Sequence, residues 1–295
     1  MIITNQNNLP QALVDVVSRD YEYKDKRYSA TAILKPIRQL MLERRHNKEI
    51  SQDVSDMIWL IFGNAVHKLI ENAPSNSSQF KEEHVEIKVG DYTLSGIIDL
   101  YDIDKEEIQD WKTASVYKYK SGDWEDYFNQ VMIYAYMLTK LGFNVKTTKI
   151  VPMYKDYRKS EARKGDYPEF PIQVLENKVS DKGLAEIELM IYEKFKLIEQ
   201  YEKVSDDELP LCTMEERWAK PTQYAVMKKG NKKALKLCNS EQEAKDYIGD
   251  KDYYIEKREG IDNKCTEYCS ACKFCSYWKE HYGEKQDITN NWNLW

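Results

Sequence analysis

Four polar side chains with metal-binding and phosphate-binding chemistry follow one another along the sequence: His67, Asp99, Asp110 and Lys112. Carboxylate oxygens are the ligands that Mg²⁺ prefers, and an imidazole beside them shifts the preference toward Mn²⁺. A metal held in this way polarises a phosphate and acidifies a bound water, and a lysine can position that water or stabilise the charge that develops on the phosphate. The four residues therefore predict a divalent-metal site that hydrolyses phosphodiesters.

The two aspartates lie on segments that are expected to form a β-hairpin. Residues 92–100 and 107–113 are rich in strand-forming residues and flank a polar turn at 102–106. If the turn is centred in the middle of that segment, Asp99 lies directly opposite Asp110, with Cβ atoms about 4.5–5.5 Å apart. Two carboxylates at that separation repel each other unless a positive charge lies between them, which favours a metal site over an ordinary core.

The other two candidates are positioned by the second strand of this hairpin and by a preceding helix. Lys112 is two residues beyond Asp110 and therefore points to the same face of the sheet. His67 lies on an apolar-periodic helix that Asp53 or Ser55 is expected to cap. A single Asp-x-Lys or a single helical histidine is commonly structural, so the prediction depends on finding all four residues in order on suitable elements.

The pattern of the whole chain predicts an α/β fold. A polar arm over 1–27 precedes a helix over about 30–46 that Ser29 caps. The expected order is then helix, three strands, helix and strand, over residues 53–72, 84–89, 92–100, 107–113, 123–141 and 146–154. Further on, we expect a long helix over 183–203, a hairpin formed by 224–227 and 233–237, and a short helix opened by the capping box Ser240-x-x-Glu243.

The order and spacing of Gly63-x-x-x-His67, Asp99, Asp110-Trp111-Lys112 and Gln130-x-x-x-Tyr134 resemble the RecB-type branch of the PD-(D/E)XK nuclease superfamily. The resemblance covers roughly residues 57–154, and it implies a restriction-endonuclease-like core, a DNA substrate and Mg²⁺ or Mn²⁺. It also implies that the backbone carbonyl of Trp111 is a further metal ligand and that Gln130 and Tyr134 line the DNA path near Lys112. Taken alone, Tyr134 is more typical of a core. Two nearby acids, Glu71 and Glu86, are expected at the surface or behind the site.

This resemblance suggests three parts of the chain. Residues 1–56 are expected to form an N-terminal arm and helix, residues 57–155 the nuclease core, and residues 156–295 a C-terminal extension with a helix, a hairpin and a cysteine-rich segment that wraps the core. A separate C-terminal domain is the alternative.

Four of the six cysteines fall within eleven residues, in the pattern C-x3-C-x2-C-x2-C: Cys265, Cys269, Cys272 and Cys275. In a cytoplasmic protein such crowding favours a metal over disulfides, and both zinc and a 4Fe–4S cluster accept four thiolates. Free thiols are the remaining alternative. The spacing also matches the radical-SAM cysteine triad, but no barrel of alternating strands and helices follows it.

Several RecB-type nucleases hold an iron–sulfur cluster with one distant cysteine and three near the C-terminus. The resemblance therefore implies a 4Fe–4S cluster held by Cys265, Cys269 and Cys275, with zinc as the alternative. Cys212 is favoured over Cys238 as the distant ligand, and Cys272 is left as a spare thiol. The chain departs from some of these relatives, because their distant cysteine precedes the catalytic motifs and no cysteine precedes residue 212 here.

Composition is compatible with a nuclease that acts inside a cell. A 42% hydrophobic and 32% charged composition is that of a globular protein, and the net charge of −6 argues against a general coat for nucleic acids. Some of the twenty-two tyrosines and seven tryptophans could stack on bases, although core packing explains most. No apolar stretch approaches the ~20 residues of a membrane span, and residues 1–4 lack signal-peptide character. We expect a cytoplasmic location, which is the host cytoplasm if the protein is phage-encoded.

The function expected from these patterns is a metal-dependent DNA nuclease, specifically an exonuclease on DNA ends or single strands in phage recombination or replication. The chain has no G-x-x-x-x-G-K-S/T loop, so a helicase or recombinase partner would come from another gene. Two alternatives remain open, a catalytically inactive or partner-dependent DNA-binding protein on the same fold, and a nuclease that acts on RNA.

Overall fold

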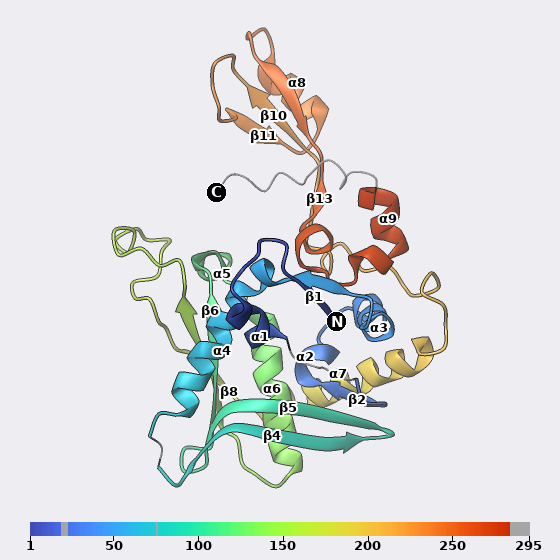
Figure 1. Ribbon diagram of the computed structural model, residues 1–295. Helices are drawn as coiled ribbons and strands as arrows, with labels where there is room; N and C mark the ends of the chain where they lie inside the picture. The colour runs from blue at the N-terminus through green and yellow to red at the C-terminus, as the bar shows by residue number, and fades with distance from the viewer. Residues whose placement is uncertain (19–22, 75, 284–295) are drawn as a thin grey trace. The chain divides into compact units, whose positions relative to one another are not determined.

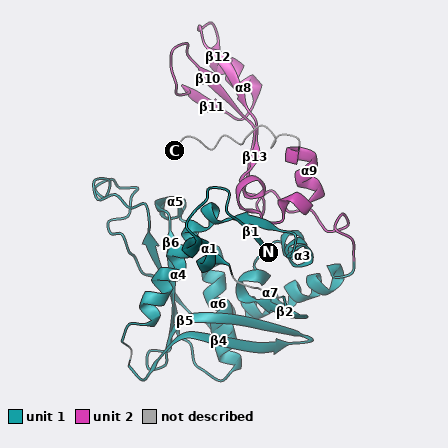
Figure 2. Ribbon diagram, viewed as in Figure 1, with its two compact units in different colours: residues 1–203 teal, residues 204–295 magenta. Residues whose placement is uncertain are grey.

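The computed structural model describes residues 1–18, 23–74 and 76–283 (Figure 1). The chain divides into two compact units, residues 1–203 and 204–295 (Figure 2). Among the described residues, no helix combines the length and the apolar character needed to cross a membrane.

A six-stranded mixed sheet forms the centre of the first unit. The order of its strands is β2-β5-β6-β7-β8, and β4 also pairs with β5. β5 is antiparallel to β4 and β6, whereas β6 and β7 are parallel. The strands are β2 (Arg27–Ser29), β4 (Gln79–Val89), β5 (Tyr92–Asp102), β6 (Glu107–Ala114), β7 (Thr147–Tyr154) and β8 (Leu175–Lys178).

The two hairpins of the sheet have the turns that the sequence predicts. Gly90 has a φ of +58° between β4 and β5, a conformation that glycine adopts at little cost. The β5–β6 ladder pairs Asp102 with Glu107 and Leu100 with Gln109, which is the predicted register. β4 begins at Gln79, five residues before the predicted strand.

Three helices of the first unit complete the predicted order. They are α4 (Ile58–Glu71), which packs against β6, α6 (Glu125–Lys140), which packs against β7, and α7 (Asp181–Tyr201), which packs against α6 (Figure 1). Every residue of α6 from Val131 to Leu138 is buried, and Ser180 caps α7 by accepting the Gly183 N–H. The helix, three strands, helix and strand of a restriction-endonuclease-like core are therefore present, and the predicted α/β fold class is confirmed. A short helix that the sequence did not predict, α5 (Val116–Ser121), lies between β6 and α6.

The prediction of one continuous helix over 30–46 is wrong. The segment forms two helices, α2 (Ala30–Ile33) and α3 (Ile37–Arg45). Pro36 separates them, because proline has no N–H for a helical hydrogen bond and its ring clashes with the preceding turn. Ser29 caps α2, as predicted, by accepting the Ala32 N–H.

The N-terminal segment is more ordered than the predicted arm. β1 (Ile2–Thr4) pairs in parallel with β3 (Ser51–Asp53), and α1 (Gln11–Val17) follows it. Asp53 then caps a 3₁₀ turn over Val54–Met57, which leads directly into α4.

The second unit contains a small sheet between two strands that pair with each other. β9 (Ala219–Lys220) pairs with β13 (Ile261–Asp262), and the sheet of order β11-β10-β12 lies between them in the sequence. Its elements are β10 (Gln223–Met227), β11 (Lys236–Cys238), α8 (Glu241–Ile248) and β12 (Tyr254–Arg258). The predicted hairpin is confirmed, and Ser240 caps α8 by accepting the Glu243 N–H. The cysteine-rich segment follows, with a π-helical turn (Lys264–Tyr268), a 3₁₀ turn (Cys272–Phe274) and α9 (Ser276–Tyr282).

Replacing Gly96 by alanine should destabilise the first unit. A Cβ at Gly96 would lie 2.5 Å from Cε1 of the buried Tyr134, so the ring or the strand must move. Overpacking of this kind costs about 1–3 kcal/mol in free energy of unfolding, which urea denaturation can measure.

Gly165→Ala is the matched control, because nothing lies within 4 Å of its added Cβ. We expect that variant to stay within about 0.5 kcal/mol of wild type. Equal stability of Gly96→Ala and wild type would contradict the packing of Tyr134 on β5.

Candidate active site

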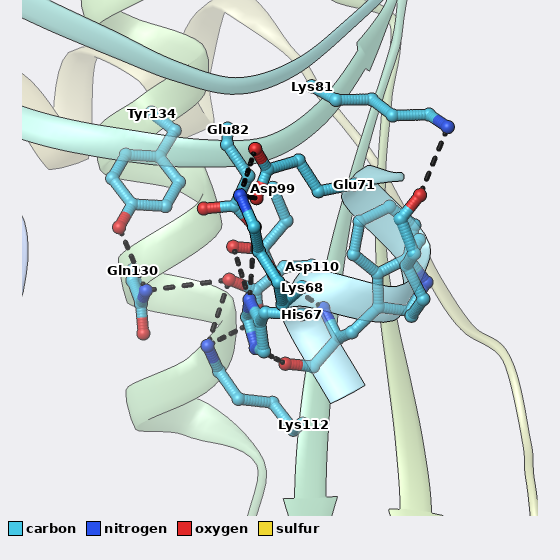
Figure 3. A network of polar contacts seen from close by, with 12 residues as sticks. His67, Lys68, Glu71, Lys81, Glu82, Asp99, Asp110, Lys112, Gln130 and Tyr134 are labelled. Carbon is cyan, nitrogen blue, oxygen red and sulfur yellow. Dashed lines mark hydrogen bonds and ion pairs between the residues drawn. The ribbon is translucent and has the colours of Figure 1, made fainter. Parts of the chain in front are cut away.

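Three side chains of types that can ligate a metal, from three different elements, meet at one point. His67 comes from α4, Glu82 from β4 and Asp99 from β5 (Figure 3). Nδ1 of His67 lies 3.3 Å from Oε1 of Glu82 and 3.4 Å from Oδ1 of Asp99. The ligand atoms of all three lie within 4.8 Å of one another, close enough to surround one divalent ion.

The sheet is locally unpaired where these residues meet. The β4–β5 ladder skips the position of Glu82, and the β5–β6 ladder stops one pair before Asp99 and Asp110. Glu82 has a φ of +51°, a left-handed conformation that is strained for a residue with a Cβ. Oδ2 of Asp99 instead accepts the backbone N–H of Trp111 at 2.7 Å. Regular strand pairing is therefore interrupted at Asp99, and the Asp99 carboxylate contacts His67 of α4 and Trp111 of β6.

Asp110 and Lys112 form the second half of the site. The Asp110 side chain is buried, and Nζ of Lys112 lies 2.7 Å from its Oδ2 and donates to its Oδ1 at 2.9 Å. On α6, Nε2 of Gln130 donates to Oδ1 of Asp110 at 3.4 Å and to the Tyr134 hydroxyl at 2.9 Å (Figure 3). Burial raises the pKa of Asp110, although the Lys112 charge opposes that shift. A nearly dry carboxylate beside an ammonium group is suited to holding that lysine in one position.

His67 holds a proton strongly in this arrangement. Its hydrogen bond to Asp99 is the largest cause that raises its pKa to about 9, and the charges of Asp99 and Glu82 add to it. Nε2 lies 3.0 Å from the Trp111 carbonyl oxygen, so a protonated ring donates on both sides. The carboxylate oxygens of Asp99 and Glu82 are the acceptors near Nδ1 of the ring.

The side chains fit a hard divalent cation. The donor set consists of carboxylate oxygens and one imidazole, which is the set expected for Mg²⁺ or Mn²⁺. Oδ2 of Asp110 is one of the few buried side-chain oxygens among the described residues that accepts no hydrogen bond, and it has only its ion pair with Lys112. A buried acceptor of this kind gains from a cation.

The structure brings all six predicted side chains into one network, with a different grouping from the predicted one. His67 and Asp99 form a donor group with Glu82, whereas Asp110 faces Lys112 and Gln130. The Trp111 carbonyl faces Nε2 of His67. Tyr134 accepts a hydrogen bond from Gln130 and also packs against Gly96, so it belongs both to the site network and to the core.

Glu82 was missed in the sequence. It is one of several acids in its strand, and it lies opposite Asp99 in the β4–β5 register, at a position that the predicted strand over 84–89 does not reach. Its carboxylate contacts His67. The two acids set aside from the sequence are paired elsewhere: Glu71 binds Lys68 at 2.8 Å, and Glu86 binds Arg27.

In the second unit, three of the predicted cysteine ligands interact. Burial, followed by the charges of Asp262, Cys212 and Cys275, raises the pKa of the Cys265 thiol to about 12. Cys272 also interacts with Cys275, and burial raises its pKa. Within residues 1–18, 23–74 and 76–283, no three cysteine sulfurs lie within 4.8 Å of one another.

A polar network joins the two segments that carry these cysteines. Arg217 donates to the Cys212 carbonyl, and its Nε lies 3.2 Å from Oδ1 of Asp262. The hydroxyls of Tyr277 and Tyr282 donate to Oδ2 of Asp262 at 2.7 and 3.0 Å. Cys238, in contrast, is buried in the small core of β10, β11 and α8.

Comparison with known proteins defines the family. The model of the PD-(D/E)XK nuclease superfamily matches residues 12–279, so the chain belongs to this superfamily, as the sequence predicts. No curated protein is significantly similar to the sequence.

Several solved structures are similar to parts of the chain. The protein SSO0001 has 18% identity and a TM-score of 0.45, over 63% of this chain and 82% of that one. The alkaline exonuclease LHK-Exo from Laribacter hongkongensis has 12% identity and a TM-score of 0.38, over 59% and 89%. A phage-related exonuclease from Haemophilus somnus 129PT has 10% identity and a TM-score of 0.28, over 64% and 80%.

Affinity for Mn²⁺ should rise with pH until the pH passes about 9, the pKa of His67. The ring must lose its proton before its nitrogen can bind a metal, so metal binding releases a proton below that pH. Isothermal titration calorimetry across pH 6.5–9 can measure the slope.

His67→Gln should bind Mn²⁺ more weakly and with a shallower dependence on pH, because the amide does not titrate in this range. Identical pH slopes for wild type and His67→Gln would show that this proton is not displaced by the metal.

Proposed function

We propose that the protein is a metal-dependent DNA nuclease that hydrolyses phosphodiester bonds. The observation that carries the proposal is the joining of His67, Glu82 and Asp99 to the Asp110–Lys112 pair in one network, in a chain of the nuclease superfamily. A solvated surface would not bury Asp110 or raise the pKa of His67 to about 9.

Each residue has a proposed role. His67, Asp99 and Asp110 hold Mg²⁺ or Mn²⁺, with Glu82 as an additional ligand and the Trp111 carbonyl as a further one. The bound ion supplies Lewis-acid polarisation of the scissile phosphate. Lys112 stabilises the charge that develops on that phosphate, and Asp110 positions Lys112 by its two contacts with Nζ. Gln130 and Tyr134 line the path of the DNA beside Lys112.

The mode of action is proposed from the family resemblance of the sequence motifs. We infer an exonuclease that acts on DNA ends or single strands in phage recombination or replication, in the cytoplasm of the cell or of the phage host. A recombinase or helicase from another gene is the inferred protein partner. We propose that residues 57–155 form the nuclease core that carries catalysis and that residues 156–295 form the cysteine-rich C-terminal extension.

We also propose a 4Fe–4S cluster in the second unit, with Cys212, Cys265, Cys269 and Cys275 as ligands. The interaction of Cys265 with Cys212 and Cys275, and the Arg217–Asp262 link between their segments, support these three members of the set. The burial of Cys238 in a different core supports Cys212 as the distant ligand. Zinc is the alternative occupant, because it also accepts four thiolates.

Cleavage of end-labelled single- and double-stranded DNA tests the proposed activity. Wild type should cut with Mg²⁺ or Mn²⁺ and not with EDTA. Asp99→Asn, Asp110→Asn and Lys112→Ala should each lose at least about 100-fold in rate, the usual loss when charge stabilisation is removed.

Glu71→Gln is a matched acidic control outside the donor group, and it should cut like wild type. Retained cutting by Asp99→Asn would remove the proposed site. DNA binding without any cutting by wild type would favour a partner-dependent binding protein, and faster cutting of a matched RNA would favour an RNA nuclease.

Metal analysis of anaerobically purified protein tests the cluster. Cys212→Ala and Cys265→Ala should lose the iron and the visible absorbance of the wild type. Cys238→Ala should retain both, because that cysteine packs against Val226 and Ala244. Iron loss in Cys238→Ala with retention in Cys212→Ala would reverse the choice of the distant ligand, and zinc in place of iron would select the alternative metal.

A further inference from the structure

Helix α4 exposes an apolar surface beside the candidate active site. None of its residues is buried, although most of them are apolar. Trp59 and Phe62 are 50% and 53% exposed. A helix in a globular protein usually buries one apolar stripe, so this exposure points to a ligand that covers part of the helix.

One ridge of α4 follows β6 away from the metal donors. His67 lies against the Trp111 carbonyl, and one turn earlier a Cβ on Gly63 would lie 3.6 Å from Oγ1 of Thr113. One further turn earlier, the ring of Trp59 lies under Lys155. Because Trp59 precedes His67 by eight residues, it lies about 12 Å from it along the helix axis, the length of three or four stacked nucleotides.

One lysine and two aromatic rings meet where this ridge ends. The Lys155 N–H donates to the carbonyl of Ala114, the last residue of β6, and its ammonium lies 3.7 Å from the centroid of the Trp59 ring. Burial against this surface lowers the pKa of Lys155. The Phe62 ring lies 5.7 Å from that of Trp59.

Two further lysines lie beside another aromatic ring of the same unit, and each of them also has an acidic neighbour, Asp110 for Lys112 and Asp126 for Lys118. The ammonium groups of Lys112 and Lys118 lie 5.6 and 4.9 Å from the Tyr127 ring centroid. Positive charge interleaved with aromatic faces is the chemistry that binds single-stranded nucleic acid, because phosphates pair with the lysines and bases stack on the rings. Exposed rings beside ammonium groups match a nucleic-acid strand, because such a strand offers stackable bases and phosphates together.

We propose that Trp59 is a stacking platform for an unpaired base of the DNA strand that enters the active site, and that Lys155 binds the adjoining phosphate. The inference rests on the proposed nuclease function and names the form of its substrate, a strand with a single-stranded end. Lys155 covers the indole in this structure. A base stacks on an aromatic ring more strongly than a surface lysine does, so the strand displaces the ammonium, which then pairs with a phosphate.

Fluorescence anisotropy with a labelled single-stranded oligodeoxynucleotide tests the platform. All variants carry Lys112→Ala so that the DNA is not cut, and the full chain is used. Trp59→Ala should raise the Kd for the single strand about 5- to 150-fold, the loss expected from one stacked base. Trp59→Phe should recover most of the affinity, because it restores an aromatic face.

Leu60→Ala is the matched control, since Leu60 is as exposed as Trp59 and adjacent to it, and it should leave the Kd unchanged. Lys155→Gln should reduce the slope of log K against log salt by about 0.7, the value for one phosphate contact on a single strand. Blunt duplex DNA, whose bases are paired, should show a smaller effect of Trp59→Ala.

An unchanged Kd in Trp59→Ala, or equal losses in Trp59→Ala and Leu60→Ala, would overturn the proposal and leave the surface to a protein partner. This failure is distinguishable from failure of the nuclease proposal. Metal-dependent cutting by wild type with unchanged Trp59→Ala binding removes only the platform, whereas lost binding in Trp59→Ala with no cutting by wild type removes only the activity.

Discussion

Repulsion among the carboxylates of Glu82, Asp99 and Asp110 is the constraint on which this site depends. Their mutual repulsion grows as they are withdrawn from water, and each gains from a nearby positive charge. In this structure the protonated His67 ring and the Lys112 ammonium provide that positive charge. Burial is the largest cause that raises the pKa values of Glu82 and Asp110, and the charge of Asp99 adds to both shifts. The hydrogen bond to Asp99 raises the pKa of His67 to about 9. A divalent cation satisfies the same carboxylates with more charge than a proton, which is why the arrangement suits a metal.

The backbone is locally strained where the three carboxylates come together. Glu82 takes a left-handed conformation inside a strand, and the sheet loses its pairing around Asp99. Backbone strain of this kind costs about 1–3 kcal/mol, and it persists only where the surroundings hold it in place. Here the β4–β5 hairpin continues in register on both sides of Glu82, and the buried helix α6 presses Tyr134 against Gly96 of β5. The same helix carries Gln130 to Asp110, so one element both supports the strand and completes the site.

Much of this arrangement could be predicted because turns and periodicity fix which residues are neighbours. The turn at 102–106 predicts the observed β5–β6 register, although the ladder ends one pair before Asp99 and Asp110. The spacing of polar residues identifies Lys112 and the helix that carries His67. Apolar periodicity alone predicts one helix over 30–46, which is wrong because Pro36 interrupts the segment. Glu82 is missed because the predicted strand begins at residue 84, although the β4–β5 register continued to residue 82 places it opposite Asp99. Its left-handed backbone has no local sequence signal, because tertiary contacts hold it. The exposure of α4 is a similar case, because an apolar-periodic helix ordinarily predicts burial.

Thermal unfolding during a titration with Mn²⁺ tests the central claim most directly, because it needs no substrate and no assumption about the reaction. A metal that binds only the folded state stabilises it by about 2.7 kcal/mol at 100 times its Kd. The account predicts that the melting temperature of wild type rises steadily with Mn²⁺ concentration, and that Asp99→Asn, which removes a central charge of the donor group, shows little or no rise. A wild-type melting temperature that does not change with Mn²⁺, or an equal rise in Asp99→Asn, would contradict a metal site at His67, Glu82 and Asp99.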